Sequence, residues 1–211
     1  MAYTLIIAEK PSVARDIARV LKCGEKGEEY FAGGDYRVTW ALGHLVSLCE
    51  PEEIDPKYKK WQERDLPILP DSIPLKVLPK TKSQYACVKK LMLSKDCSGL
   101  ICATDAGREG ELIFRYLYRM AGCEKPFSRL WISSMTDEAI REGFSQVKPG
   151  AAYDSLYESA RCRSEADWLV GMNASRAFTL KYDALLSVGR VQTPTLALLV
   201  KRHHEIASFV P

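Results

Sequence analysis

The sequence predicts an α/β fold in which a mainly parallel sheet flanked by helices is followed by a mainly helical segment. Short apolar runs typical of buried strands alternate with amphipathic helical patterns through most of the first 150 residues. The alternation stops near Pro149-Gly150, and no convincing strand pattern follows. We therefore expect two domains, residues 1–150 and residues 151–211.

The individual elements follow from local patterns. β-branched and aromatic content predicts strands, and apolar spacing with proline at a first helical position predicts helices. The expected strands cover residues 4–8, 36–42, 100–104 and 127–132. The expected helices begin at Pro11-Ser12 and near residues 83, 111, 138, 154 and 193, with Ser134 or Thr136 and then Thr193 as N-caps, and residues 154–180 form one long helix or two. Residues 50–80 are rich in proline and charge, so regular structure is not expected there.

Composition bounds the class of protein. The chain has 211 residues, of which 46% are hydrophobic and 27% charged, an ordinary soluble balance. No export signal and no apolar run of roughly 20 residues is visible, so we expect a cytoplasmic protein that does not enter a membrane. The seven cysteines lack Cys-x-x-Cys spacing, which favours free, mostly buried thiols. A net charge of +3 does not by itself predict nucleic-acid binding.

Three acidic residues follow buried strands. Glu9 comes directly after the first strand, and Asp105 and Glu109 come after the strand at 100–104. Ligands gather at the carboxyl ends of parallel strands, and carboxylate oxygens suit Mg²⁺. If the two strands are neighbours, the three carboxylates meet at one edge of the sheet, and the sequence then indicates a Mg²⁺ site there. The alternative is that these acids are solvated caps or ion-pair partners of Lys10 and Arg108.

The turn between Asp105 and the following helix carries two glycines, which allow a sharp bend and a close approach of the backbone. Arg108 and Arg115 lie near the same edge and could contact phosphate. The turn lacks the spacing of a P-loop and of a dinucleotide-binding loop.

An acid after the first strand, followed by Asp-x-x-x-Glu after a later one, resembles the Toprim domain. The usual second motif of that domain is Asp-x-Asp, and here Gly107 stands in place of the second aspartate. The resemblance leaves Glu9, Asp105 and Glu109 as the metal ligands and puts a second metal ion in doubt. Glu111 is a possible substitute ligand, although we expect it inside the helix.

Further segments narrow the resemblance to type IA DNA topoisomerases of the bacterial topoisomerase III kind. They cover almost the whole chain in the family's order: Ile-Ala-Glu-Lys-Pro-Ser (7–12), Trp-Ala-Leu-Gly-His-Leu (40–45), Asp-Ala-Gly-Arg-Glu-Gly-Glu-Leu-Ile (105–113), Arg-Leu-Trp-Ile-Ser-Ser (129–134), Ala-Asp-Trp-Leu-Val-Gly-Met-Asn (166–173) and Gly-Arg-Val-Gln-Thr-Pro-Thr-Leu (189–196). The last two segments are the most specific, because other Toprim proteins lack them.

The resemblance implies an isomerase that changes DNA topology. Such an enzyme cuts one DNA strand through a 5′-phosphotyrosine intermediate, passes another strand and rejoins the break without ATP. It implies Glu9 as general acid and base, Lys10 as the cation at the scissile phosphate, and Mg²⁺ held by the three carboxylates. It also implies a monomer that binds single-stranded DNA. The residues that would contact the DNA are Arg163, Asp167, Arg190 and Gln192.

The nucleophile of such enzymes lies in a Tyr-x-Arg context, and none of the ten tyrosines here has that context. We therefore expect an N-terminal portion of a longer enzyme, unable to cleave DNA alone. Two other interpretations stay open: a Toprim metal-dependent nuclease or primase, and a non-catalytic DNA-binding module. For His44 the choice is between a DNA contact and a structural hydrogen bond, and for Trp168 between base stacking and packing in the helical domain.

Overall fold

The computed structural model describes residues 2–210 in two compact units. The first unit comprises Met1–Leu48 and Leu75–Arg161, and the second comprises Cys49–Pro74 and Cys162–Pro211. Residues 49–74, which the sequence analysis assigned to the first domain, therefore group with the helical segment. The boundary near residue 150 stays a prediction.

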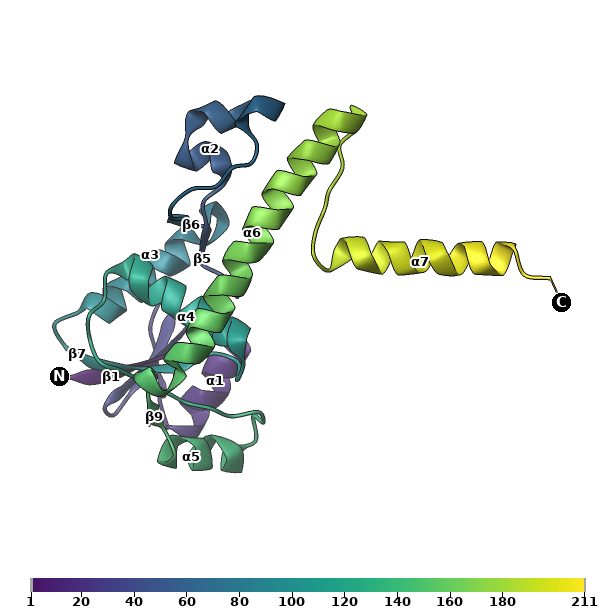
Figure 1. Cartoon of the computed structure of the whole chain (residues 1–211). Coiled ribbons are helices and arrows are strands. Elements are labelled where there is room, and N and C mark those ends of the chain that lie inside the picture. The colour runs from purple at the N-terminus through teal and green to yellow at the C-terminus, as the bar shows by residue number, and fades with distance from the viewer. Residues whose placement is uncertain (1, 211) are drawn as a thin grey trace. The chain divides into compact units, whose positions relative to one another are not determined.

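The first unit is built on a seven-stranded sheet with four parallel strands at its centre (Figure 1). In spatial order the strands are β2 (Glu25–Lys26), β3 (Tyr30–Gly33), β4 (Tyr36–Trp40), β1 (Tyr3–Ala8), β7 (Cys97–Ala103), β8 (Phe127–Arg129) and β9 (Lys148–Pro149). The parallel core β4-β1-β7-β8 contains the four strands that the sequence predicts. The antiparallel hairpin β2-β3 and the edge strand β9 are additions that the sequence analysis did not anticipate.

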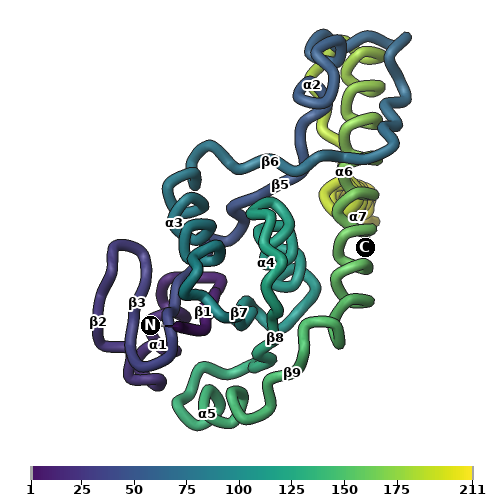
Figure 2. Tube along the Cα trace, turned by 90° about the vertical axis from the view of Figure 1, so that its left-hand side faces the viewer, coloured from purple at the N-terminus to yellow at the C-terminus, as the bar shows by residue number. Residues whose placement is uncertain are grey.

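Helices cover both faces of this sheet, and Figure 2 shows α3 (Lys82–Leu93) and α4 (Arg108–Ala121) on one side of it. The other face is covered by α1 (Pro11–Val20) and α5 (Asp137–Ser145). Successive side chains of a strand point to opposite faces. In β1, Leu5 and Ile7 therefore join the core beneath α3 and α4, whereas Ile6 and Ala8 join the core beneath α1. Burial on both faces explains why residues 5–8 of β1 are all apolar.

The segment rich in proline contains more regular structure than expected. Strand β6 (Leu75–Val77) pairs with β5 (Val46–Leu48) in a small antiparallel sheet of the first unit. Helix α2 (Pro51–Ile54) lies in the second unit, with proline at its first position and the capping box of Glu50 and Glu53 at its start. Three short 3₁₀ helices, at Pro56–Lys59, Glu63–Asp65 and Pro79–Thr81, also begin at or near prolines or acids. Proline here begins short elements instead of excluding them.

The second unit contains most of one long helix, α6 (Asp154–Tyr182), and all of α7 (Gln192–Ala207). Trp168 is buried in this unit, and its indole N–H donates to the carbonyl of Cys49 over 2.8 Å. The side-chain amide of Asn173 exchanges hydrogen bonds with the backbone of Ile68. These contacts attach residues 49–74 to α6, and they support the packing role of Trp168.

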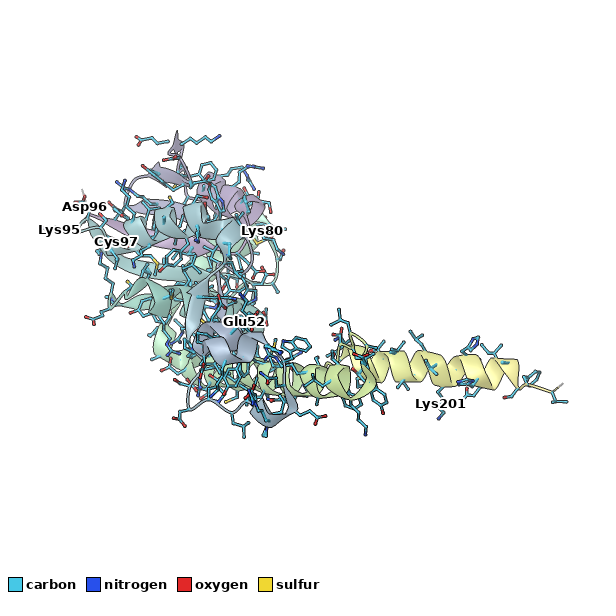
Figure 3. The ribbon with its side chains drawn as sticks, turned by 90° about the horizontal axis from the view of Figure 1, so that it is seen from above. Glu52, Lys80, Lys95, Asp96, Cys97 and Lys201 are labelled. Carbon is cyan, nitrogen blue, oxygen red and sulfur yellow. The ribbon has the colours of Figure 1, made fainter. Side chains whose placement is uncertain are left out.

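Helix α7 begins at Gln192, two residues before the predicted first helical residue Pro194, and its N-cap is Val191, not Thr193. The hydroxyl of Thr193 instead accepts a hydrogen bond from the backbone N–H of Gly189. Every residue of α7 is exposed, and Figure 3 shows side chains standing out along it, among them the labelled Lys201.

Within residues 2–210, no helix is both long enough and apolar enough to cross a membrane.

Candidate active site

The carboxyl ends of β1 and β7 bring two of the predicted acids together. The two strands are parallel neighbours, with Ala8 opposite Ala103, so the residues that follow them emerge side by side. The backbone N–H of Asp105 donates to Oε2 of Glu9 over 3.2 Å. Glu9 is nearly buried, at 9% exposure. The strand register therefore sets the position of the Glu9 carboxylate against the turn that carries Asp105.

Lys10 lies between these two acids. Its ammonium nitrogen is 3.9 Å from Oε1 of Glu9 and 3.8 Å from Oδ2 of Asp105. Lys10 is also the N-cap residue of α1, where Pro11 occupies the first helical position. More than half of the lysine side chain is exposed. One cation thus offsets the repulsion between two carboxylates while remaining open to an anion from solvent.

The third predicted acid, Glu109, has a different partner. Helix α4 begins at Arg108, earlier than the expected residue 111, so Glu109 lies in its first turn. Its Oε1 is 2.6 Å from Nε2 of His44, which comes four residues after β4. The contact agrees with the structural interpretation of His44, since the imidazole holds a carboxylate at the sheet edge.

The arrangement does not assemble a set of metal ligands. Among the residues described, no group of three or more His, Cys, Asp or Glu side chains is placed to hold a metal ion. Glu9 and Asp105 share Lys10, whereas Glu109 is engaged by His44. The donor chemistry suits Mg²⁺, but joining the three carboxylates around one ion would require Glu109 to release His44. The three-carboxylate site therefore stays a prediction.

Glu111, considered as a substitute ligand, is engaged elsewhere. Its side chain is fully buried, and its two oxygens accept hydrogen bonds from Arg129 Nε over 3.0 Å and Arg115 Nε over 2.8 Å. A carboxylate held by two arginines in the interior is not available to an ion. The arginines satisfy the charge that burial would otherwise penalise.

Arg129 is a site residue that the sequence analysis missed. It is fully buried, and its guanidinium donates to the carbonyls of Cys102, Thr104, Asp105 and Leu130. It thereby fixes the backbone at the end of β7, where the acidic turn begins. The only charged residue in the predicted strand at 127–132 was the one available signal.

Cys102, whose carbonyl accepts a hydrogen bond from Arg129, has a completely buried thiol. Burial raises the pKa of this thiol to about 11. It therefore stays protonated at neutral pH and acts as a small apolar group beneath the turn.

Arg115 does not face a phosphate, contrary to expectation. Only 13% of its side chain is exposed, and it turns inward to Glu111 and to the carbonyl of Gly150. A terminal nitrogen of Arg115 also donates to Oδ1 of Asp154, the first residue of α6, over 2.7 Å. Arg108 remains exposed at the turn.

The two glycines of the turn have different roles. A Cβ on Gly110 would lie 2.1 Å from the carbonyl oxygen of Asp105 and 2.9 Å from its nitrogen. A Cβ on Gly107 would meet nothing within 4 Å, and its extended φ of 179° suits any residue. Only Gly110 is therefore required by close approach.

The second unit brings together three of the four predicted DNA contacts. Arg190 donates from Nε to Oδ1 of Asp167 over 2.5 Å and from a terminal nitrogen to Oδ2 over 3.2 Å. Arg163 lies 3.9 Å from the same carboxylate. The hydrogen bond from Arg190 holds the pKa of Asp167 below its ordinary value. The three side chains are between 40% and 50% exposed, so both guanidinium groups remain accessible.

Gln192, the fourth predicted contact, is not part of that cluster of ion pairs. Its amide nitrogen donates to the hydroxyl of Ser187 over 2.9 Å. As the first residue of α7 it lies at a helix N-terminus, where backbone N–H groups attract anions.

Two protein families match the chain. Residues 4–135 match the Toprim domain family, and residues 151–211 match the family described as DNA topoisomerase. DNA topoisomerase 3 of Bacillus thuringiensis (strain Al Hakam) is 56% identical over 209 residues, which are 99% of this chain and 29% of that protein. DNA topoisomerase 3 of Bacillus subtilis (strain 168) is 53% identical over 211 residues, which are 100% of this chain and 29% of that protein.

A solved structure shares the fold. Full-length topoisomerase I from Thermotoga maritima is 23% identical, with a TM-score of 0.67, over 98% of this chain and 31% of that one. The chain thus spans less than a third of the length of these relatives.

Proposed function

The chain belongs to the Toprim family and runs on into a DNA topoisomerase segment, and from this premise we propose that it is the N-terminal part of a type IA DNA topoisomerase 3. The complete protein would break, pass and rejoin single DNA strands through a 5′-phosphotyrosine intermediate without ATP. The chain itself would supply the acid, base and phosphate-binding side of that site, and the tyrosine would come from elsewhere in the longer protein. A cytoplasmic location and a monomeric state belong to the same proposal.

One observation carries the proposal: Glu9, Lys10 and Asp105 meet at the carboxyl edge of β1 and β7. Transesterification at a phosphodiester needs a proton donor for the leaving 3′ oxygen and positive charge at the phosphate. A nearly buried carboxyl group beside an accessible ammonium group can fill both roles within one short segment. In this assignment Glu9 protonates the leaving oxygen and removes the proton again during rejoining, while Lys10 neutralises the scissile phosphate.

The second unit would hold the DNA. Arg163 and Arg190 flank Asp167, and both guanidinium groups keep donors for a phosphate oxygen. Gln192 at the start of α7 adds a helix N-terminus, a favourable position for a phosphate. We propose single-stranded DNA as the ligand, because the nick and the free 3′ end must be held as a single strand during passage.

Magnesium is the cofactor that the family implies. When bound, the ion would offset the negative charge of the acidic edge during rejoining. Glu9, Asp105 and Glu109 remain the proposed ligands, and Glu109 would have to leave His44 to join the other two. This exchange of partners is itself testable, since replacing Glu109 with glutamine should lower the affinity for Mg²⁺ measured by calorimetry.

The test compares the 211-residue chain with a longer protein that contains it. Each is incubated with a 3′-labelled single-stranded oligonucleotide, because a 5′-phosphotyrosine link retains the 3′-side fragment. The sample is then denatured and examined for labelled DNA covalently attached to protein. We expect adducts only from the longer protein. Adducts with the 211-residue chain alone would contradict the assignment of the nucleophile.

The same experiment separates the rival functions. A Toprim nuclease would release unlinked DNA ends in a Mg²⁺-dependent manner, and a primase would extend an oligonucleotide with nucleotides. In the longer protein, Glu9→Gln should strongly reduce relaxation of supercoiled DNA, whereas Glu25→Gln, an exposed change in β2, should not. Full relaxation by the Glu9 variant would favour a non-catalytic DNA-binding module.

A further inference from the structure

A buried ion-pair network connects the acidic turn to the start of α6. Its centre is Glu111, whose side chain has no exposed surface and accepts one hydrogen bond on each oxygen. Arg129 binds one oxygen, and Arg115 binds the other. The carboxylate is one of the few buried charges in the first unit, and neither of its partners belongs to the proposed catalytic set.

One branch of the network reaches the catalytic edge. A terminal nitrogen of Arg129 donates to the carbonyl of Asp105 over 2.6 Å, and the other donates to the carbonyl of Thr104 over 2.7 Å. The Thr104 hydroxyl in turn donates to the carbonyl of Gly110 over 2.7 Å, which closes the turn onto the first turn of α4. The backbone that positions Asp105 is therefore held from the interior by a single guanidinium group.

The other branch reaches the helix that leads to the DNA-contact residues. Arg115 donates to Gly150 over 2.9 Å and to Asp154 over 2.7 Å, and its guanidinium lies against the rings of Phe127 and Tyr157. Asp154 is the first residue of α6. The same helix carries Arg163 and Asp167 farther along the chain.

We propose that Glu111 is a positioning residue that, through Arg129 and Arg115, couples the turn carrying Asp105 to the first turn of α6. Hydrogen-bonded charges in a low-dielectric interior are held strongly, and an unmatched one is penalised. Moving Arg115 with the start of α6 therefore shifts Glu111, and the shift of Glu111 loosens Arg129 and the turn. A change at the start of α6 therefore alters the stability of the turn carrying Asp105, and a change in the turn alters the start of α6.

The structural coupling does not depend on the enzymatic activity, although its consequence rests on the proposed function. In the longer enzyme the coupling would link the position of the turn carrying Asp105 to the helix that carries the proposed DNA-contact residues Arg163 and Asp167. Hydrogen–deuterium exchange on the 211-residue chain tests the coupling directly, whereas the covalent-adduct experiment tests the proposed function. Failure of one is therefore distinguishable from failure of the other.

The test is hydrogen–deuterium exchange, followed by mass spectrometry, on the 211-residue chain and its variants. Asp154→Asn removes the charge at the far end of the network, at a side chain that is 60% exposed, so the fold should survive. Glu158→Gln is the matched control, because it removes an exposed charge one turn later on the same helix, where the partner is Arg161. Glu111→Gln removes the charge at the centre.

We expect Asp154→Asn to speed exchange about threefold or more both at residues 150–158 and at residues 104–111. Glu111→Gln should do the same more strongly, and Glu158→Gln should leave residues 104–111 unchanged. Exchange in β1 serves as the reference for global unfolding. An effect of Asp154→Asn confined to residues 150–158 would overturn the proposal, as would an equal effect of the control on the acidic turn. Should Glu111→Gln fail to fold, the result with Asp154→Asn still decides.

Discussion

Replacing Gly110 with alanine tests whether the acidic turn needs the close approach seen between α4 and Asp105. The added Cβ would lie 2.1 Å from the Asp105 carbonyl oxygen and 2.9 Å from the Asp105 nitrogen, both backbone atoms. Relief requires the turn to move by more than 1 Å relative to α4, measured against an ordinary contact of about 3.5 Å. That carbonyl is held by Arg129, and the carbonyl of Gly110 is held by Thr104, so both hydrogen bonds are strained by the movement.

The magnitude of the Gly110→Ala effect follows from three contributions. Overpacking of this kind costs about 1–3 kcal/mol. Weakening two buried hydrogen bonds costs about 2 kcal/mol more at their usual net value of about 1 kcal/mol each. Replacing glycine within a helix returns about 1 kcal/mol. We therefore expect the free energy of unfolding to fall by about 2–4 kcal/mol, measured by urea denaturation with far-ultraviolet circular dichroism.

The control for this experiment is Gly107→Ala in the same turn. A Cβ there meets nothing within 4 Å and the backbone is extended, so the loss should stay below about 1 kcal/mol, the range of a changed N-cap residue. A Gly110→Ala variant as stable as the unaltered chain would refute the argument. So would an equal loss in both variants, because the loss would then not arise from the contact with Asp105.

Three further predictions concern other parts of the chain. Trp168→Phe removes the hydrogen bond to the Cys49 carbonyl while keeping an aromatic ring, so thermal unfolding should show a loss of about 1 kcal/mol. Because the pKa of the buried Cys102 thiol is raised from 9.0 to about 11, its contribution to stability is complete below pH 9 and is lost as the pH rises towards 11. The loss of unfolding free energy amounts to about 2–3 kcal/mol. Between pH 9 and 11 the stability of the Cys102→Ala variant should therefore depend less on pH than that of the unaltered chain. Equal pH dependence would contradict the raised pKa of the Cys102 thiol. Asp167→Ala releases Arg190 and Arg163 from their shared carboxylate, so the affinity for single-stranded DNA in fluorescence anisotropy should change while the melting temperature stays within a few degrees; an unchanged affinity would remove this cluster from the DNA site.

The sequence allowed the parallel core to be predicted because burial leaves a direct mark on residue choice. Strands β1 and β7 are covered on both faces, so residues 5–8 and residues 100–103 are continuously apolar, and each run is followed by a polar residue. The pattern placed Glu9 and Asp105 after buried strands, and their meeting depended on the two strands being parallel neighbours, as β1 and β7 are. The hairpin β2-β3 left no such mark, because β2 has only two residues and both are exposed.

Side-chain partners could not be predicted in the same way. In the sequence, Glu111 resembles a further metal-ligand candidate after Asp105 and Glu109. Only the position of Arg129, on the strand next to β7, shows that the Glu111 charge is neutralised inside the protein. Glu109 lies in the first turn of α4, but its contact with His44 joins residues 65 positions apart, and no local spacing encodes such a contact. Periodicity reports which face a residue occupies, but it does not report which distant partner meets it there.

The charge balance at the acidic edge leads to a last prediction. Glu9, Asp105 and Glu109 with Lys10 leave two net negative charges where a DNA phosphate is proposed to lie. At about 10 Å and an effective dielectric constant of about 20, each uncompensated charge costs a phosphate about 1.7 kcal/mol. Added Mg²⁺ should therefore raise the affinity of the chain for single-stranded DNA about tenfold at constant ionic strength, although salt alone lowers it. Glu109→Gln should weaken this dependence, because it removes one of the charges that attract the ion, and Glu25→Gln should not. If Mg²⁺ changed the affinity of neither the unaltered chain nor the Glu109→Gln variant, the two uncompensated charges would not lie close to the bound phosphate, and the carboxylates would not hold an ion there.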